Sequence, residues 1–285
     1  MNHLQETSQP QLPYRFEFMP HEFEAIKACN DEHGFAIVKG VLNEEQVSVL
    51  KAEVLRIVDP QGKLQPGESV VDGDYIEEAR ELWKLLEYQP FIRLYAYLLG
   101  TDHMTIHRSA AIIRMPGNEP MYWHTDFSFG SGPPQTANDV LNRGEWPNGA
   151  WFYLNGTHPS RAGLAIIPDS HHPDWPGPEG FTLIRNTFYP EGSEPDAYTG
   201  FEVPGMMPVL SDPGDLLLFA ARTYHAVFPH NGDEPRLSCG MVLRPADISF
   251  STPWTLPESA HHFIESAPEG IKQYVKGYTG IQKSW

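Results

Sequence analysis

The pattern of apolar and polar positions divides the chain into two parts that predict different secondary structure. From residue 20 to residue 99, apolar side chains recur mainly at helical spacing. After Gly100, short β-prone runs alternate with turns, which is typical of an antiparallel sandwich or barrel. The predicted strands are Met104–Met115, Met121–Asp126, Ala150–Asn155, Gly163–Pro168, Met206–Leu210, Leu216–Ala220 and Arg236–Leu243.

The helical part carries recognisable start and stop signals. Asn43 is a typical N-cap, and Gln46 three residues later is its capping-box partner. Pro60 ends this helix, and a polar loop is expected to run from there to Asp74. The other predicted elements are helices over residues 22–32, 76–89 and 91–99, the last two separated at Pro90, and a short strand at Phe35–Val38.

Two long connections, residues 127–148 and 172–204, are rich in Gly, Pro, aromatic and acidic residues. Connections of this length inside a compact domain are often functional lids. The first 19 residues predict a tail or an edge extension, and Pro257–Gly277 predicts a closing helix. We therefore expect one domain over residues 1–285, with helical elements at 20–99, a β core at about 100–245 and a closing segment at 246–285.

Charge and composition narrow the class of partner. The 285 residues contain 20 Lys and Arg against 37 Asp and Glu, a formal net charge of −17. Such an acidic chain repels phosphates, so nucleic acid and anionic membranes are not expected partners. Solubility explains the charge most simply, and a cationic substrate is the alternative explanation.

The remaining features favour a cytoplasmic location. Cys29 and Cys239 lie far apart in apolar contexts, which suggests neither a zinc cluster nor a disulfide framework. The N-terminus lacks the basic start and apolar core of a signal peptide. No apolar run approaches the roughly 20 residues of a membrane span. The sequence leaves the oligomeric state open.

The segment Met121–Phe127 carries the first candidate chemistry. His124 and Asp126 are two residues apart, so in an extended chain both side chains point to the same face. An apolar run that begins at Leu216 leads to His225, the best candidate for a third ligand. Two His and one carboxylate, with the other face of the metal open, form the facial triad of non-haem iron(II) oxygenases. His-x-Asp alone is weak, because a surface histidine bonded to an aspartate has the same pattern.

A basic and a hydroxyl side chain follow His225. Arg236 and Ser238 share one face of a predicted strand. A guanidinium pairs bidentately with a carboxylate, and a hydroxyl can add a third contact. These residues would bind the distal carboxylate of 2-oxoglutarate while its keto-acid end chelates iron. For Arg236 alone, a surface arginine on a strand is the plain alternative.

The joint pattern of His-x-Asp, about a hundred residues, His and then Arg-x-Ser resembles the phytanoyl-CoA dioxygenase family. The resemblance extends over Gly34 to Pro245. Gly34–Leu42 resembles the family's first strand, Arg114–Gly117 its basic residue and Pro-Gly turn, and Gly163–His171 its Gly-x-Leu stretch that ends in Pro-Gly-Ser-His. Asp169 departs from the family, which usually has Gly there, and the two long connections match no family feature.

The resemblance implies a fold, a reaction and a ligand set. The fold is mainly β, a double-stranded β-helix or cupin-like jelly roll with N-terminal helices packed on one sheet. Iron(II), 2-oxoglutarate and dioxygen would oxidise, most simply hydroxylate, an unactivated C–H bond of a small-molecule metabolite, with release of succinate and CO2. Demethylation, desaturation, ring chemistry and epimerisation are related outcomes. The site residues are His124, Asp126 and His225 for the metal and Arg236, Ser238 and Arg114 for the cosubstrate. Arg114 could instead contact the substrate or simply brace its turn.

Several side chains have weaker claims to contact the substrate. Trp123 and Phe127 flank the triad, where large rings would exclude water. Trp151 and Tyr153 alternate on a strand whose face lines the cavity if the resemblance holds. Arg161 is a candidate if the substrate is anionic. Each aromatic residue could equally be a packing residue.

Two other classes of protein compete with the oxygenase hypothesis. A zinc-dependent hydrolase can use two histidines and an aspartate with a bound water, but it would not need Arg236 and Ser238. A non-catalytic jelly-roll binding module would not need three converging ligands.

Overall fold

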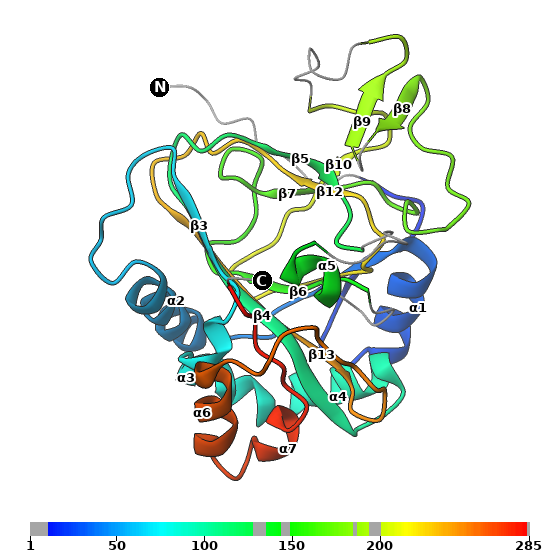
Figure 1. Ribbon diagram of the computed structural model, residues 1–285. Helices are drawn as coiled ribbons and strands as arrows, with labels where there is room; N and C mark the ends of the chain where they lie inside the picture. The colour runs from blue at the N-terminus through cyan, green and yellow to red at the C-terminus, as the bar shows by residue number, and fades with distance from the viewer. Residues whose placement is uncertain (1–10, 128–134, 144–148, 185–186, 194–200, 284–285) are drawn as a thin grey trace.

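The structure, a computed structural model, describes residues 11–127, 135–143, 149–184, 187–193 and 201–283. Two β-sheets face each other and form the frame (Figure 1). The major sheet contains, in spatial order, β1 (Glu17–Phe18), β2 (Phe35–Val38), β11 (Leu216–Phe219), β6 (Gly149–Tyr153), β13 (Arg236–Pro245), β4 (Met104–Arg114) and β3 (Ser69–Asp72). The minor sheet contains β10 (Met207–Pro208), β7 (Leu164–Ile166), β12 (His225–Val227) and β5 (Met121–His124). This is the predicted jelly roll.

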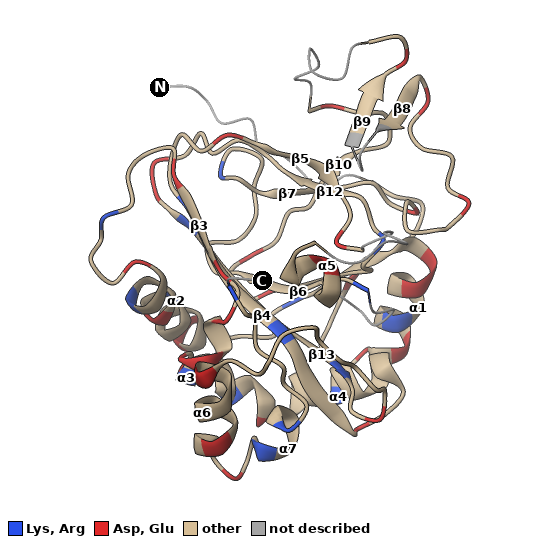
Figure 2. Ribbon diagram, viewed as in Figure 1, with Lys and Arg blue, Asp and Glu red and all other residues tan. Residues whose placement is uncertain are grey.

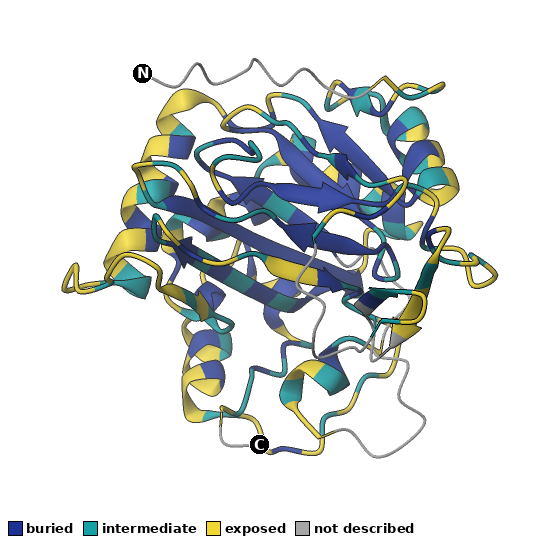
Figure 3. Cartoon of the chain, turned by 90° about the horizontal axis from the view of Figure 1, so that it is seen from above, coloured by how far each residue is buried: buried dark blue, intermediate teal, exposed yellow. Residues whose placement is uncertain are grey.

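Burial explains why the central strands are apolar along their whole length. All four residues of β2 and of β11 are buried, as are nine of the ten residues of β13. The minor sheet faces one side of the major sheet and helices cover the other, so neither face of these strands meets water. Figure 3 shows the central strands of the frame as buried, whereas the helices carry exposed outer faces. The edge strand β3 and the start of β5 are more exposed.

The helical layer lies on the far side of the major sheet (Figure 1). Its helices contact the sheet mainly through β4 and β13. The elements are α1 (Phe23–His33), α2 (Glu44–Val58), the 3-10 turn η1 (Tyr75–Glu77), α3 (Arg80–Trp83), the 3-10 turn η2 (Lys84–Leu86), α4 (Gln89–Leu99), α6 (Glu258–Ser266) and α7 (Lys272–Val275). A further short helix, α5 (Ala137–Leu141), lies in the first long connection.

The predicted capping box of Asn43 and Gln46 is present at the start of α2. The helix predicted over residues 76–89 is instead broken into three short pieces. Glu53 of α2 explains the break, because its buried carboxylate accepts hydrogen bonds from the backbone N–H groups of Glu81 and Leu82, at 2.9 and 3.2 Å. These bonds start a new helix at α3. Pro90 lies in the first turn of α4 instead of separating two helices, since proline fits the first turn of a helix.

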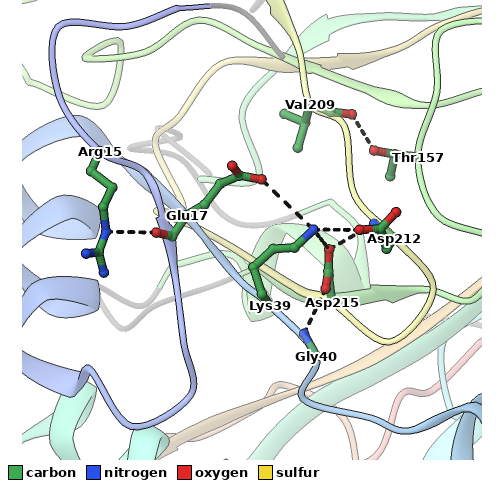
Figure 4. Close-up of polar contacts among 8 residues, drawn as sticks. All are labelled: Arg15, Glu17, Lys39, Gly40, Thr157, Val209, Asp212 and Asp215. Carbon is green, nitrogen blue, oxygen red and sulfur yellow. Dashed lines mark hydrogen bonds and ion pairs between the residues drawn. The ribbon is translucent and has the colours of Figure 1, made fainter. Parts of the chain in front are cut away.

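Lys39 connects the end of β2 to the turn before β11 (Figure 4). Its ammonium group forms ion pairs with Asp212 and with the buried Asp215. The Asp215 carboxylate also accepts hydrogen bonds of 2.8 Å from the backbone N–H groups of Gly40 and Asp212. These contacts fix the start of the strand that leads to His225.

Acidic side chains gather on the helical layer, notably on α1, α3 and α6 (Figure 2). Within the described ranges, no helix is both long and apolar enough to cross a bilayer.

Candidate metal centre

Two neighbouring strands of the minor sheet bring the predicted triad together. His124 of β5 and His225 of β12 are direct partners in the antiparallel register, and their ring centroids lie 4.3 Å apart. Asp126 follows β5, and its Oδ1 lies 3.8 Å from Nε2 of His225. One ligand atom from each of the three residues lies within 4.8 Å of the other two. Their role as metal ligands stays a prediction.

A bulge in β5 orients the first ligand. The register moves from His124 opposite His225 to Met121 opposite Val227, so three residues of β5 span two of β12. The extra residue changes which side chains share a face. Met121 and His124 both line the cavity between the sheets, whereas Trp123 packs on the outer face of the minor sheet.

Backbone carbonyl groups hold both imidazole rings in place. Nδ1 of His124 is 2.8 Å from the carbonyl oxygen of Tyr122, and Nδ1 of His225 is 3.0 Å from that of Thr223. A carbonyl oxygen only accepts, so Nδ1 carries the proton and Nε2 presents its lone pair. Burial, together with the neighbouring His124, lowers the pKa of His225 to about 4, so this ring is neutral at pH 7. Neutral imidazole is the form that binds a metal.

The carboxylate of the triad is ionised and oriented by an arginine. Burial alone would raise the pKa of Asp126, but His225 and Arg108 hold it below its usual value. Arg108 Nη2 lies 3.3 Å from Asp126 Oδ2, and the same guanidinium donates to the side-chain oxygen of Asn142 just after α5. Two imidazoles and one carboxylate with a fixed orientation fit iron(II) by the chemistry of the donors.

A cavity of about 180 Å³ opens beside the triad. It lies between the two sheets, and its wall is largely apolar. The lining residues are Ser69, Val71, Ile112, Arg114, Met121, His124, Asp126, Trp151, Tyr153, Leu164, Phe219, His225, Val227 and Arg236.

The cavity contains two buried guanidinium groups. Arg236 of β13 and Arg114 of β4 are direct register partners, with 3% and 8% of their surfaces exposed. Within the described part of the chain, Nε of Arg236, Nη1 of Arg114 and Oγ of the neighbouring Ser238 have no hydrogen-bond partner. Unpaired buried donors are costly, so three such groups side by side indicate a site for an anionic ligand.

The weaker substrate candidates separate into two groups. Trp151 and Tyr153, alternate residues of β6, both line the cavity. The other three are not among the residues that line it. Trp123 Nε1 donates to the carbonyl oxygen of Phe201, the Phe127 ring lies under Arg222 at 3.7 Å, and Arg161 is exposed.

Sequence reasoning missed the part of the wall that β3 provides. Ser69 and Val71 line the cavity, although they fall in the stretch expected to be a polar loop. The two adjacent β-branched residues Val70 and Val71 were the available signal for a strand, but four residues are few for a strand prediction.

The second long connection contains elements that were not predicted. β8 (Phe181–Ile184) and β9 (Thr187–Pro190) form a hairpin, and β9 contacts β5. Side chains of this connection pack against the outer face of the minor sheet and form a separate cluster, which we call the outer core. Its buried members are Trp123, Ala165, Ile167, Phe188, Val203, Tyr224 and Ala226.

Comparisons with known proteins agree with this geometry. The family model for phytanoyl-CoA dioxygenase matches residues 30–238. The 1-deoxypentalenic acid 11-beta-hydroxylase of Streptomyces arenae is 25% identical over 282 residues, which cover 89% of this chain and 92% of that protein.

Solved structures share the fold at low sequence identity. The epimerase SnoN, crystallised with Fe3+, alpha ketoglutarate and nogalamycin RO, superposes with a TM-score of 0.58 at 21% identity, covering 82% of this chain and 87% of SnoN. HygX from Streptomyces hygroscopicus, crystallised with nickel, 2-oxoglutarate and hygromycin B, gives a TM-score of 0.56 at 16% identity, covering 78% of this chain and 87% of HygX.

Proposed function

The chain belongs to the phytanoyl-CoA dioxygenase family, and from this premise we propose that it hydroxylates an unactivated C–H bond of a small-molecule metabolite. The general class, a 2-oxoglutarate-dependent non-haem iron oxygenase, follows from the family. Hydroxylation as the outcome is supported by the activity in the name of the Streptomyces arenae relative.

One observation carries the proposal. The His124, Asp126 and His225 cluster and Arg236, whose Nε is unpaired, line the same cavity, and Ser238 lies two residues from Arg236 on β13. A metal-chelating keto acid with a distal carboxylate satisfies both groups at once. A hydrolytic zinc site would use the triad but would leave the buried Nε of Arg236 without a partner.

Each proposed residue has a distinct task. His124, His225 and Asp126 would hold the iron, while Arg108 orients the Asp126 carboxylate. Arg236 and Ser238 would bind the distal carboxylate of 2-oxoglutarate and so fix the direction of the cosubstrate. Bound iron with 2-oxoglutarate and dioxygen supplies the oxidising power, with succinate and CO2 as products. The apolar wall would exclude water and hold the substrate C–H bond near the metal.

An anaerobic titration tests the class of reaction. The protein with iron(II) should bind 2-oxoglutarate and develop the weak visible absorption band of that chelate. In air, with a panel of metabolites, it should then form succinate together with a product heavier by one oxygen atom. A protein that neither develops the band nor forms succinate would be a hydrolase or a binding module.

Asp126→Ala provides the matched test of the ligand set. We expect this variant to bind iron more weakly and to lose succinate formation by orders of magnitude, because a charged ligand is removed. Asp174→Ala, at an exposed aspartate, is the control and should behave as the wild type. Wild-type iron content and turnover in Asp126→Ala would remove this residue from the proposed triad.

A further inference from the structure

The cavity contains more positive charge than the proposed cosubstrate uses. Asp126 is the single carboxylate among the described lining residues, and Arg108 already pairs with it. A divalent cation, ionised Asp126, Arg108, Arg236 and doubly ionised 2-oxoglutarate together carry one net positive charge. Arg114 adds a second positive charge in a buried site, which is costly unless a further anion balances it.

Arg114 lies between the buried end of the cavity and its mouth. On one side its register partner is Arg236, which is 3% exposed, and on the other side it is the exposed Ser69 of the edge strand β3. The carbonyl oxygen of Glu119 accepts from Nη2 of Arg114 at 3.3 Å, while Nη1 has no partner in the described ranges. A buried guanidinium nitrogen is thus available on the path to the metal.

The wall around this path is apolar. Val71 and Met121 at the mouth are 62% and 40% exposed, although both are large hydrophobic residues. Ile112, Leu164 and Val227 continue the apolar surface inward. Exposed apolar residues at the rim of a cavity mark the place where an apolar ligand binds.

We propose that the substrate is an apolar carboxylic acid whose carboxylate is bound by Arg114 while its hydrocarbon body lies against the β3 side of the cavity. The inference rests on the proposed function, because it assigns the 2-oxoglutarate carboxylate to Arg236. It makes β3 a specificity element, with Ser69 beside the bound carboxylate and Val71 against the hydrocarbon. Of the roles that the sequence left open for Arg114, it selects contact with the substrate over contact with the cosubstrate.

The test measures binding without turnover. The iron(II) and 2-oxoglutarate complex is prepared without oxygen, and the shift of its visible band is followed while decanoic acid, cyclohexanecarboxylic acid or decalin-2-carboxylic acid is added. Each acid is compared with its methyl ester, which keeps the hydrocarbon and removes the charge. A hydrogen bond to a charged group is worth about 1.5–3 kcal/mol, so at least one acid should bind about ten- to a hundredfold more tightly than its ester.

Variants assign the effect to Arg114. In Arg114→Gln we expect the preference for acid over ester to fall to about threefold or less, with the affinity for 2-oxoglutarate nearly unchanged. Arg236→Gln should show the opposite pattern, a weakened 2-oxoglutarate complex. Arg93→Gln, at an exposed arginine of α4 outside the cavity, should change neither. Arg114→Lys keeps the charge and should retain part of the preference, which guards against misfolding of the glutamine variant.

Three results would overturn the proposal: equal binding of every acid and its ester by the wild type, an unchanged preference in Arg114→Gln, or a loss of 2-oxoglutarate binding in Arg114→Gln as large as in Arg236→Gln. Failure of the proposed function looks different, because the wild type would then develop no band with 2-oxoglutarate in the first place.

Discussion

At the scale of single residues, the candidate centre owes its order to short-range contacts. Each histidine of the triad donates from Nδ1 to the carbonyl group two residues before it in the same chain segment. The orientation of each ring is therefore set within its own segment, before the two strands meet. The Asp126 carboxylate is instead oriented from the opposite sheet, by Arg108 of β4.

Substitution of Arg236 tests its proposed contact with the cosubstrate. Arg236→Lys keeps the charge but loses the planar fork that matches a carboxylate. We expect the apparent KM for 2-oxoglutarate to rise about ten- to a hundredfold, since a hydrogen bond to a charged group contributes about 1.5–3 kcal/mol. Iron content should stay nearly constant, because Arg236 would contact only the distal carboxylate. Steady-state kinetics and metal analysis check both; an unchanged KM would move the carboxylate contact to another residue, with Arg114 next.

Asp169 shows how a departure from the family can preserve a turn. The family usually has Gly at this position, and Asp169 adopts the left-handed backbone conformation that Gly favours, with φ of 63°. Aspartate tolerates this region better than most residues. Its Oδ1 also lies 2.7 Å from Nδ1 of His33, which connects the turn to the end of α1. The turn is therefore retained despite the substitution.

At the scale of elements, the sequence predicted those structures that local signals define. The cap at Asn43 and the buried strand Phe35–Val38 were identified within a residue. The bulge in β5 could not be predicted, because it arises from the register between β5 and β12 rather than from β5 itself. The short strand β12 was missed for a related reason: three residues acquire strand geometry only between two partners.

The predictions for the site divide in the same way, into features that local signals define and features that depend on long-range pairing. The spacing of His124 and Asp126 predicted two ligands on one face, and the structure places both beside the cavity. Trp123 packs in the outer core because successive residues of a strand point to opposite faces, which places it on the face opposite His124. The contribution of β3 depends on a pairing between β3 and β4 whose partners are more than 30 residues apart, so no local pattern contains it.

The turn before β11 provides a test at this scale. Gly214 has φ of 94°, and a Cβ there would lie 2.3 Å from the carbonyl oxygen of Leu42. Gly214→Ala should therefore lower the free energy of unfolding by about 2–4 kcal/mol, from backbone strain and steric conflict together.

Gly62→Ala is the matched control, because Gly62 also has a positive φ, of 61°, but nothing lies within 4 Å of the Cβ position. We expect a loss of about 1 kcal/mol there. Urea unfolding of both variants gives the comparison. Equal losses would show that the contact with Leu42 relaxes without cost.

At the scale of the whole molecule, the C-terminal segment returns to the edge of the major sheet. Lys283 forms an ion pair of 3.1 Å with Asp74, and the Tyr278 hydroxyl donates to Glu77 at 3.1 Å. Both acceptors follow β3, whose residues Ser69 and Val71 line the cavity. The closing segment thus supports the strand that we propose as the specificity element.

Asp72, at the end of β3, makes this region sensitive to pH. Burial, followed by its hydrogen bond with Asp74, raises the pKa of Asp72 to about 7 from an ordinary value of 3.8. The folded protein therefore retains a proton that the unfolded chain releases, and stability decreases as the pH rises through this range.

Asp72→Asn removes the titration and keeps a neutral group of the same shape. The variant should gain stability relative to the wild type between pH 5 and pH 7.5, by on the order of 1 kcal/mol after allowance for partial exposure. Urea unfolding of both proteins at the two pH values measures the difference. A constant difference between the two pH values would mean that the Asp72 carboxyl ionises normally in the folded protein.

The register of His124 opposite His225 has a consequence for folding as well as for chemistry. These residues are adjacent in space but 101 positions apart in sequence, from 124 to 225. An ion bound by both would crosslink two strands of one sheet. The chain-entropy relation for crosslinks assigns about 4.7 kcal/mol to a loop of about 100 residues. On the proposed ligand set, the ion that activates dioxygen would therefore also reduce the number of conformations open to the unfolded chain.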